Sequence, residues 1–586
     1  MREVWLRAGF GLFLSLAGST VAFAQPASDT IAPEPGTGVE AKEAVVARKH
    51  MVAAANPLAA QAGLDVLRAG GSAADALIAV QAVLGLVEPQ SSGLGGGAFV
   101  LWYDAAAGTV TSFDARETAP AAATPALFLD ASGKPLDFFA AVVGGRSVGV
   151  PGVPRLLETL HERFGKRPWA ELFQSAIGLA DAGFSVSPRL SALIGEYADT
   201  LIAESAAKAY FFDAAGAPLV AGATLRNPAY AETLKALASG GADAFYAGPI
   251  AEAIVAAVRD HPTNAGGMTI ADLAAYRVKE RSAVCAPYRD HDVCGMGPPS
   301  SGGIAVGQIL GMIEPFEIGP LGPYDPEAWR IIGDATRLAF ADRGRYVADS
   351  DFTSIPKGLL NRDYLASRSA LIRRPTALPG EAVSAGDPPW DKAELRIDGF
   401  AFEAPSTTHV SIVDDAGNVV VMTSSIEGAF GSHQMAAGFL LNNQLTDFSF
   451  APDAQGQAVA NRVEAGKRPR SSMSPTIVLK DGRPVLAIGS PGGSAIIPYV
   501  AKTLVAFIDW KMDVQQAISL PHLVNRFGPY ALESGTAAEG MAKDLQALGY
   551  EVAVQDLNSG LHGIAITADG LVGGADPRRE GVALGD

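Results

Sequence analysis

Two adjacent threonines stand at the head of an expected β-strand, in the segment APSTTHVSIVDDAGNVVVMTSSIEGAF at 404–430. A threonine hydroxyl can act as the nucleophile of an acyl-transfer reaction when a base takes up its proton. Alternating apolar residues follow Thr407 and Thr408, and a turn signal at 415–418 separates them from a second alternating run, so the segment predicts a β-hairpin. Threonine is also common in strands for conformational reasons, and the pair by itself does not establish this chemistry.

Two further segments carry groups that could serve the same reaction. GKRPRSSMSPTIV at 466–478 places paired serines before a strand, and GSPGGS at 489–494 runs from a strand end through two glycines toward a helix. Consecutive backbone N–H groups at Gly492 and Gly493 could stabilise a developing oxyanion. Taken singly, each segment could equally be a turn.

The sequence lacks the motifs of several other enzyme and binding-site classes. The sequence contains no G-x-x-x-x-G-K-[ST] phosphate loop, no H-E-x-x-H zinc motif, no EF-hand loop and no G-x-S-x-G elbow. The glycine run at 93–97 does not follow the dinucleotide pattern. Ser205 and Lys208 match S-x-x-K, but the S-D-N and K-T-G motifs that accompany it in penicillin-recognising enzymes are missing. Eight histidines and two cysteines disfavour a dense metal framework.

The composition is that of a globular protein with a large core. Of 586 residues, 48% are hydrophobic and 18% are charged, which argues against disorder as the dominant state. The formal net charge of −17 disfavours nucleic acids and anionic membranes as partners, because both attract basic surfaces.

The two cysteines are too few for a disulfide scaffold but close enough for one local bond. Cys285 and Cys294 flank APYRDHDV, which is typical of a hairpin loop. A disulfide between them and a pair of unbonded thiols are both compatible with this spacing.

The N-terminal segment predicts export. Arg2 and Arg7 precede an apolar run that ends at Ala22-Phe23-Ala24, so residues 1–24 are predicted to be a signal peptide cut after Ala24. The alternative, a membrane anchor, is disfavoured because the run is short and interrupted by glycine and serine. Residues 25–45 are predicted to be a flexible leader. The mature protein is then expected to be periplasmic or secreted and to lack a membrane span.

The remaining sequence predicts a layered sandwich with sheets inside. Periodicity and caps indicate helices, strands and a Pro-rich surface connection at 351–405. Helices are expected near 57–69, 72–87, 228–260, 270–277, 302–314, 494–509 and 541–548, and two more within 151–183. Strands are expected near 97–104, 110–120, 282–296, 407–426, 438–444, 474–482, 484–493, 550–554 and 562–567.

Taken together, these segments resemble the gamma-glutamyltranspeptidase family. The shared blocks keep the family's order and are spread over most of the chain: GGSAADALIAVQAVLGLVEPQSSGLGGGAF (70–99), DARETAP (114–120), SVGVPG (147–152), PPSSGGIAVGQIL (298–310), TTHVSIVDDAGNVV (407–420), LLNNQLTDFS (440–449), GKRPRSSMSPTIV, GSPGGS and GADPRREG (574–581). The resemblance implies an N-terminal nucleophile hydrolase with a four-layer αββα fold. It also implies autocleavage of the Ser406–Thr407 bond into a large subunit, 46–406 after the leader, and a small subunit, 407–586, which together form one αββα unit.

The resemblance assigns the chemistry to Thr407. Cleavage would free its α-amine, whose ordinary pKa of about 7.7–8.0 suits a general base at neutral pH. In the family pattern Ser425 supplies an assisting hydroxyl where threonine is usual, Thr408 lines the site, and Gly492 with Gly493 forms the oxyanion hole. His409 belongs to the motif, and we expect a structural role for it. The resemblance implies neither a metal nor a cofactor.

Recognition of a γ-glutamyl group transfers in the same way. Arg116, Ser471 and Ser472 match the residues that bind the α-carboxylate, because a planar guanidinium suits a carboxylate. Gln444 and Asp447 match those that hold the α-ammonium.

One departure from the family pattern concerns the ammonium side. Glu427 stands where asparagine is usual, so it could either share a proton with Asp447 or turn away. Thr446 replaces an acid, and the short stretch between Asp447 and Ser471 suggests a more open cleft.

The resemblance implies a self-processing γ-glutamyl hydrolase/transpeptidase. Its substrates would be glutathione and related γ-glutamyl compounds, and the acyl group would pass to water or to an acceptor amino acid or peptide. A glutaryl/cephalosporin-type acylase and a catalytically silent protein that binds γ-glutamyl peptides are the alternatives.

Overall fold

The structure is a computed structural model that describes residues 38–390, 396–403, 406–526 and 528–586. The expected signal peptide and the leader up to residue 37 lie outside the described residues. The rest of the leader is attached to the domain, since the Glu40 N–H donates to the Pro577 carbonyl at 2.8 Å and the Lys42 ammonium donates to the Arg579 carbonyl at 2.6 Å. This end of the predicted flexible leader is therefore anchored.

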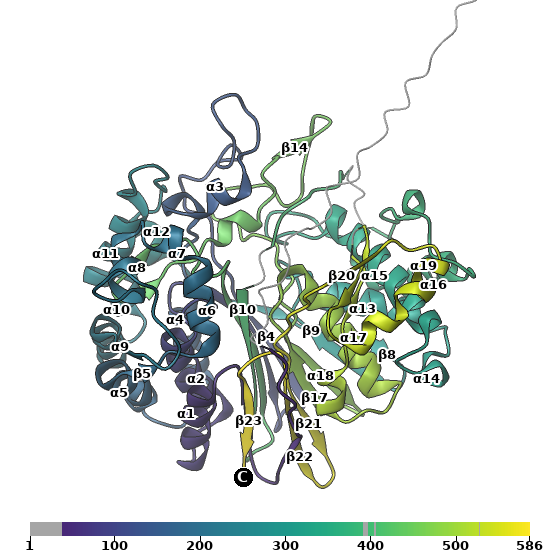
Figure 1. Ribbon diagram of the computed structural model, residues 1–586, viewed down its shortest axis with the longest axis horizontal. Coiled ribbons are helices and arrows are strands. Elements are labelled where there is room, and N and C mark those ends of the chain that lie inside the picture. The colour runs from purple at the N-terminus through teal and green to yellow at the C-terminus, as the bar shows by residue number, and fades with distance from the viewer. Residues whose placement is uncertain (1–37, 391–395, 404–405, 527) are drawn as a thin grey trace, which may run out of the picture.

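Two seven-stranded sheets form the middle of the molecule (Figure 1). All neighbouring strands in both sheets run antiparallel. The first sheet has the order β23 (Val582–Gly585), β2 (Met51–Ala54), β10 (Ser406–Val413), β11 (Val419–Glu427), β3 (Gly97–Asp104), β4 (Thr109–Ala115) and β7 (Lys279–Ser282). The second has the order β1 (Val45–Ala47), β22 (Gly570–Ala575), β21 (His562–Thr567), β17 (Arg483–Gly489), β16 (Thr476–Lys480), β9 (His291–Gly295) and β8 (Val284–Tyr288).

Each sheet combines strands from both sides of the Ser406–Thr407 bond. In the first sheet, β11 and β23 follow this bond, β10 contains it at its first residue, and the other four strands precede it. In the second sheet, β16, β17, β21 and β22 follow it. Neither part of the chain contains a complete sheet, so the two parts can form this fold only together.

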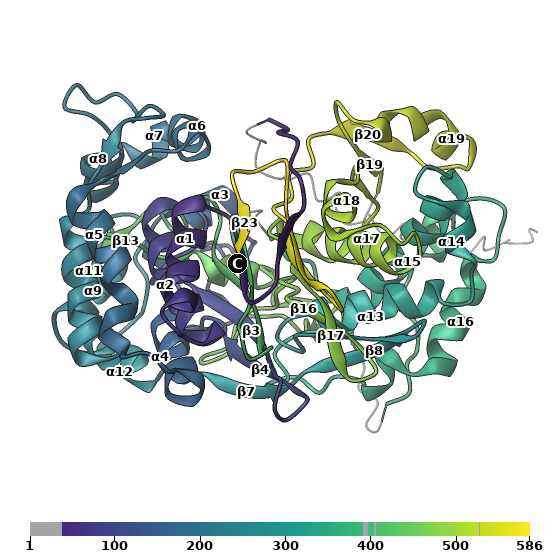
Figure 2. The same cartoon turned by 90° about the horizontal axis from the view of Figure 1, so that it is seen from below.

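Helices cover the outer face of each sheet. Figure 2, which shows the molecule from below, makes these outer layers visible. On the first sheet lie α1 (Pro57–Arg68), α2 (Ala73–Val87), α4 (Val153–Phe164) and the helices further out, namely α5 (Gln174–Ala182), α6 (Pro188–Glu196), α7 (Ala198–Leu201), α8 (Ser205–Phe211), α9 (Pro228–Gly240), α10 (Asp243–Tyr246), α11 (Gly248–Arg259) and α12 (Ile270–Ala275). On the second sheet lie α13 (Gly302–Ile313), α14 (Ile318–Leu321), α15 (Pro326–Tyr346), α16 (Arg362–Ile372), α17 (Ile496–Ile508), α18 (Val514–Ser519) and α19 (Ala542–Ala547). The predicted four-layer αββα fold is confirmed.

Smaller elements complete the chain. They are α3 (Phe138–Val142), the strand pairs β5 (Phe184–Ser185) with β6 (Thr224–Leu225), β12 (Met435–Ala436) with β13 (Phe439–Leu440) and β14 (Asp453–Ala454) with β15 (Gln457–Ala458), and the three-stranded sheet of β18 (Leu523–Val524), β19 (Tyr530–Glu533) and β20 (Val552–Gln555). Among the described residues, no helix combines the length and the hydrophobicity that a membrane crossing requires.

The side chains of β10 alternate between two cores. Val410 and Ile412 join the core under the helices of the first sheet, whereas Val413 joins the core between the two sheets. This is the period of two that a strand imposes. The Ser411 hydroxyl follows the same rule, because it donates to the His562 carbonyl in the second sheet at 3.1 Å. The odd-numbered positions of β10 therefore face the second sheet.

The caps that mark the first two helices in the sequence are present in the structure. The Asn56 side chain accepts from the Leu58 N–H ahead of α1, and Ser72 and Asp75 form a capping box at the start of α2. The predicted hairpin at β8 and β9 also forms. Cys285 and Cys294 are directly opposite in its register and are joined by a disulfide with an S–S distance of 2.03 Å.

Two parts of the element prediction are wrong. The stretch 351–405 is not only a surface connection, because it contains α16 and also Glu403, whose side chain is buried. The 21-residue helix α15 lies where no element is predicted. It buries charged residues as well as apolar ones, including Arg330, Asp334 and Arg343, so its sequence shows no clean apolar face.

We predict that Gly489→Ala destabilises the contact between the two sheets. Gly489 ends β17 against the ring of His409 on β10, and a Cβ atom there would lie 2.2 Å from the His409 Cε1 atom. Overpacking of this kind costs about 1–3 kcal/mol of unfolding free energy, which denaturant titration would measure. Gly540→Ala is the control, because nothing lies within 4 Å of the added Cβ and its backbone is ordinary. Equal stability of the two variants would contradict this packing.

Candidate active site

A short chain of hydroxyl contacts surrounds the Ser406–Thr407 bond. The Thr407 hydroxyl lies 3.3 Å from the Ser425 Oγ atom and donates toward it. The Ser425 hydroxyl in turn donates to the carbonyl of Ser406 at 2.8 Å, and the Glu427 N–H donates to Ser425 Oγ at 2.8 Å. One chain of hydrogen bonds thus links the candidate nucleophile to the candidate assisting hydroxyl, and that hydroxyl to the carbonyl of the bond expected to break.

An irregularity in the β10–β11 pairing produces this arrangement. Ser406 pairs with Glu427 and Thr408 pairs with Ser424, so two residues of β11 lie opposite the single residue Thr407. Such a bulge re-aims side chains at the end of a sheet. Glu427 has a backbone φ of 80°, an uncommon value for a residue with a side chain, and it lies directly at this bulge.

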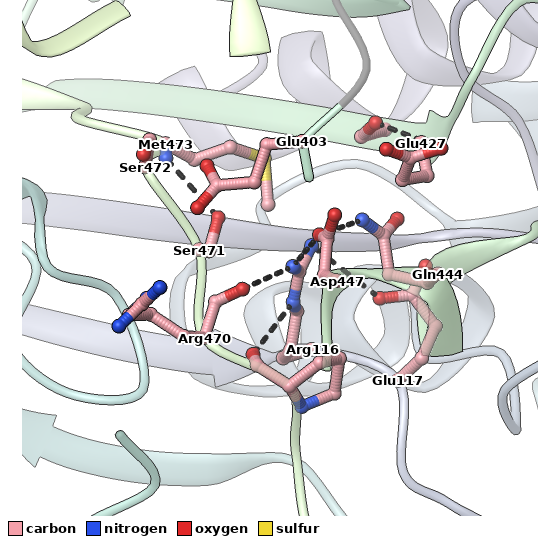
Figure 3. A network of polar contacts seen from close by, with 12 residues as sticks. Arg116, Glu117, Glu403, Glu427, Gln444, Asp447, Arg470, Ser471, Ser472 and Met473 are labelled. Carbon is pink, nitrogen blue, oxygen red and sulfur yellow. Dashed lines mark hydrogen bonds and ion pairs between the residues drawn. The ribbon is translucent and has the colours of Figure 1, made fainter. Parts of the chain in front are cut away.

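One small cavity is lined by nearly all of the candidate residues. Figure 3 shows the polar network that includes Arg116, Gln444 and Asp447. The volume of this cavity is about 20 Å³, which is room for about one water molecule. The lining residues are Arg116, Glu403, Thr407, Ser425, Glu427, Gln444, Asp447, Ser471, Ser472, Met473, Gly493 and Ile496. Of the predicted catalytic and substrate-binding residues, only Gly492 is not among them.

Arg116 and Asp447 contact each other directly. The Arg116 Nη2 atom pairs with the Asp447 carboxylate and also donates to the Arg470 carbonyl at 2.9 Å, while Nε donates to the Pro469 carbonyl at 3.2 Å. The sequence places these two side chains at opposite ends of a substrate. In the uncut chain the guanidinium is instead occupied by this internal partner.

The ammonium side of the predicted site contains two buried acceptors to which no described residue donates a hydrogen bond. The Gln444 amide donates to Asp447 Oδ2 at 2.7 Å on 3₁₀ turn 444–447. Among the described residues, no donor reaches Asp447 Oδ1 or Gln444 Oε1, although both atoms are buried. Burial raises the pKa of Asp447 to about 6, with the nearby Arg116 opposing the shift and Glu403 adding to it.

Glu427 does not turn away from the site, because it lines the cavity and its carboxylate accepts from the Asn443 amide. Asn443 also accepts from the Gly428 N–H at 2.8 Å, which ties the end of β11 to the turn that carries Gln444. The carboxylate that raises the pKa of Asp447 is that of Glu403.

Gly492 and Gly493, at the 3₁₀ turn Gly493–Ala495 that precedes α17, adopt conformations that favour glycine, with φ of 135° at Gly492 and 54° at Gly493. A Cβ atom at Gly492 would also lie 2.8 Å from the ring of Tyr499. Gly493 faces the cavity at the beginning of a helix, where backbone N–H groups point outward. An oxyanion hole at these two glycines therefore stays a prediction, since Gly493 lines the cavity and Gly492 does not.

Two motif residues lie away from the cavity. The Thr408 hydroxyl is on the opposite face of β10, 3.5 Å from the Glu88 carboxylate, so the prediction that it lines the site is not met in the uncut chain. The His409 ring contacts the Thr423 hydroxyl at 2.9 Å and the Ser411 hydroxyl at 3.1 Å. Burial holds the pKa of His409 well below its ordinary value, so its ring is a neutral packing group.

Sequence reasoning missed three buried charged residues around the cavity. Glu403 lies in the stretch taken for a surface connection, and Arg343 lies in the unpredicted helix α15. Glu117 follows Arg116 in the motif DARETAP. It is fully buried 4.0 Å from the Arg116 guanidinium, and no other described residue donates a hydrogen bond to its carboxylate. Adjacency to Arg116 was the one signal for it.

Other candidates from the sequence do not join this site. Ser205 and Lys208 lie on α8 in the outer helical layer, and neither lines the cavity. Within the described ranges, no group of three or more His, Cys, Asp or Glu side chains is arranged to hold a metal ion.

Comparison with known proteins gives consistent results. A family model described as Gamma-glutamyltranspeptidase matches residues 59–586. The glutathione hydrolase proenzyme of Bacillus subtilis (strain 168) is 37% identical over 562 residues, 93% of this chain and 93% of its own length. The Acylase ACY 1 proenzyme of Pseudomonas sp. (strain SE83) is 34% identical over 537 residues, 90% of this chain and 91% of its own. Among solved structures, cephalosporin acylase from Bacillus halodurans has a TM-score of 0.81 at 25% identity, covering 94% of this chain and 99% of its own.

We predict that Glu117→Gln removes part of the pH dependence of stability. Burial raises the pKa of Glu117 to about 8, so the folded state favours the protonated form. Unfolding releases this carboxyl to its ordinary pKa, and wild-type stability should therefore fall as pH rises from about 4.5 to 8. Glutamine cannot ionise, so the variant's advantage in unfolding free energy should grow over that range by at least about 1 kcal/mol.

Denaturant titrations at pH 5 and pH 8 would measure this difference, with Thr407→Ala in every chain so that all remain uncut. Glu252→Gln on α11 is the control, because that carboxylate is exposed. A constant difference between Glu117→Gln and its parent at both pH values would contradict the prediction.

Proposed function

The chain belongs to the gamma-glutamyltranspeptidase family and is a γ-glutamyltransferase and hydrolase, and we propose that it acts through Thr407 after cutting its own Ser406–Thr407 bond. Its substrates are glutathione and related γ-glutamyl compounds. The γ-glutamyl group passes to Thr407 as an ester and then to water or to an acceptor amino acid or peptide.

The observation that carries this proposal is the hydroxyl chain from Thr407 through Ser425 to the Ser406 carbonyl. When the Thr407 oxygen attacks that carbonyl carbon, its proton passes to Ser425, whose own proton passes to the carbonyl oxygen. The resulting tetrahedral centre breaks its C–N bond, and the proton returns to the departing nitrogen. The ester between Ser406 and Thr407 is then hydrolysed, which leaves a carboxylate on Ser406 and a free α-amine on Thr407.

The free amine completes the catalytic group. An α-amine has an ordinary pKa of about 7.7–8.0, so a useful fraction is unprotonated at neutral pH and can accept the Thr407 hydroxyl proton. Because it belongs to the nucleophile's own residue, no separate base has to be positioned. The N–H groups of Gly492 and Gly493 stabilise the oxyanion that forms on the substrate carbonyl.

Substrate recognition uses the two ends of the cavity. Ser471 and Ser472 with Arg116 bind the α-carboxylate of the γ-glutamyl group. The unpartnered oxygens of Asp447 and Gln444 accept the α-ammonium, and the carboxylate of Glu427 adds negative charge on the same side. Burial makes each of these pairings stronger than it would be in water.

The processed protein remains one unit. We infer that the fragments 46–406 and 407–586 stay associated, because each contributes strands to both sheets. We also infer export to the periplasm or the exterior, on the strength of the signal-peptide pattern at 1–24.

An acylase acting on glutaryl or cephalosporin-type amides is the second candidate. It is favoured by the 34% identity to an acylase proenzyme and by the TM-score of 0.81 to a cephalosporin acylase. A glutaryl group carries the carboxylate of a γ-glutamyl group but no ammonium. The unpartnered acceptors on Asp447 and Gln444 therefore favour the γ-glutamyl substrate. A silent binding protein has no need for the hydroxyl chain at the Ser406 carbonyl.

We predict that wild-type protein separates into two bands on a denaturing gel, whereas Thr407→Ala gives one. At the mean residue mass of this chain, the fragments 25–406 and 407–586 are roughly 39 and 19 kDa. Sequencing of the smaller fragment should read Thr407-Thr408-His409. Fully active wild-type protein recovered as a single chain would disprove the mechanism.

Ser425→Ala should slow autocleavage strongly. The variant loses the donor to the Ser406 carbonyl, and loss of one such donor reduces a rate on the order of 100-fold. The disappearance of the uncut band with time after purification measures this rate. Ser424→Ala is the matched control, because the hydroxyl of this neighbour donates to the Gly97 carbonyl instead. Similar rates for the two variants would remove Ser425 from the mechanism.

The substrate class can be tested with two chromogenic anilides. We expect the mature enzyme to hydrolyse γ-glutamyl-p-nitroanilide with a higher kcat/KM than glutaryl-p-nitroanilide, since only the first fills the acceptors on Asp447 and Gln444. Asp447→Asn should reduce this preference by lowering the rate with the γ-glutamyl compound. Preference for the glutaryl compound in the wild type would favour the acylase instead.

A further inference from the structure

Glu403 reaches the candidate active site from just upstream of the bond that is cut. It lies four positions before Thr407, it is 7% exposed, and it lines the same cavity as Thr407, Arg116 and the paired serines. Figure 3 shows its carboxylate beside Ser471 and Ser472. A charged side chain is rarely buried so far unless it is paired, so its partners are informative.

The partners of Glu403 are Arg343 and Ser472. The Arg343 Nη2 atom forms an ion pair with the Glu403 carboxylate, and Ser472 forms a side-chain hydrogen bond with it. Arg343 also donates to Ser472 Oγ at 2.8 Å, so these three groups contact one another. Ser472 is one of the serines assigned above to the α-carboxylate of the substrate. A carboxylate of the chain itself thus lies where a substrate carboxylate is expected.

We propose that Arg343 is a substrate-binding residue that, together with Ser472, binds the α-carboxylate of the γ-glutamyl group, and that Glu403 occupies this place in the uncut chain. The proposal rests on the γ-glutamyl activity proposed above and adds to it a second guanidinium and a built-in competitor.

Arg343 is held ready for an anion. It is 3% exposed, its Nε donates to the Ser301 hydroxyl at 2.8 Å, and it lies on the long helix α15. Among the described residues, Glu403 is the one carboxylate within ion-pair distance of it. Arg116, by contrast, is occupied by Asp447 and two backbone carbonyls. Arg343 is therefore the guanidinium that becomes available when Glu403 leaves.

Cleavage provides the means for that departure. In the uncut chain Glu403 is tied to Thr407 by three intervening residues, so its carboxylate competes as part of the same molecule, at an effective concentration no free ligand reaches easily. After cleavage the segment ends at Ser406 and is attached only at its upstream side. A buried guanidinium without a partner is strongly unfavourable, so the site retains affinity for one carboxylate from solution.

Mature enzyme provides the first test. Arg343→Met is combined with Glu403→Met, so that the Glu403 carboxylate is not left buried without its cation. The double variant is compared with Glu403→Met alone, which is its parent. We expect the KM for γ-glutamyl-p-nitroanilide to rise roughly 10–100-fold, as loss of a charged hydrogen bond predicts, with a smaller change in kcat. Hydrolysis of 4-aminobutyryl-p-nitroanilide, which lacks the carboxylate, should change far less. If the double variant does not fold, Arg343→Lys replaces it, with a smaller rise in KM expected.

Arg345→Met is the matched control in these measurements. Arg345 lies two residues further along α15 and pairs with Asp398 of the same upstream segment, at 2.7 Å on the surface. It should leave the KM unchanged. An unchanged KM in the Arg343 variants, or an equal loss with and without the substrate carboxylate, would overturn the proposal. A mature wild-type enzyme that hydrolyses no γ-glutamyl compound would instead refute the proposed function.

The uncut chain provides the second test. Calorimetry should detect no binding of L-glutamate to Thr407→Ala, because Glu403 fills the site and the cavity has room for about one water molecule. Thr407→Ala with Glu403→Ala should bind L-glutamate, and adding Arg343→Met should abolish that binding. Equal behaviour of Thr407→Ala with and without Glu403 would show that this carboxylate does not guard the site.

Discussion

The structure depends on one pairing, that of β10 with β11 at the bulge opposite Thr407. This irregularity places the Thr407 hydroxyl beside Ser425 and, through it, against the carbonyl of the preceding residue. A peptide bond is inert unless a nucleophile and a proton donor are both fixed in position, and here both come from adjacent strands of a buried sheet. The rigidity needed for this comes from the two cores on either side of β10, since Val410 and Val413 face different ones.

Buried charge is the second organising feature. The uncut cavity contains two ion pairs, Arg116 with Asp447 and Arg343 with Glu403, and each satisfies groups that would otherwise be costly to bury. The same groups are those that a zwitterionic substrate head would need. An internal partner thus satisfies both guanidinium groups, and under the proposed cleavage only Glu403 would be loosened, because it alone lies on the segment that would end at Ser406. Asp447 lies on the same 3₁₀ turn as Gln444 and accepts a hydrogen bond from it, so its position does not depend on the segment before Ser406.

Local sequence signals predicted what depends on local structure. The caps at Asn56 and Ser72 located α1 and α2, and alternation around the turn at 415–418 located β10 and β11. The αββα fold and most of the residues that line the cavity came from the family resemblance, since no local pattern states that β23 pairs with β2 from the other end of the chain. The sequence did not predict the buried charged residues around the cavity, because their burial depends on partners that are distant in the chain. Arg343 is on a helix without an apolar stripe, and Glu403 is in a Pro-rich stretch that is typical of a surface.

The selectivity of the site follows from what remains unpaired in it. Asp447 Oδ1 and Gln444 Oε1 are buried and receive no hydrogen bond from the described residues. A buried acceptor left empty costs about 1–3 kcal/mol, so a ligand that brings a donor to each gains over one that does not. An acyl group with a carboxylate alone would satisfy the serines and a guanidinium but leave both acceptors empty. A site built to hydrogen-bond a group rejects analogues that lack it more strongly than an apolar pocket rejects a missing methylene. The difference between a γ-glutamyl and a glutaryl substrate is one ammonium, and the unpartnered oxygens are on the side where that ammonium would lie.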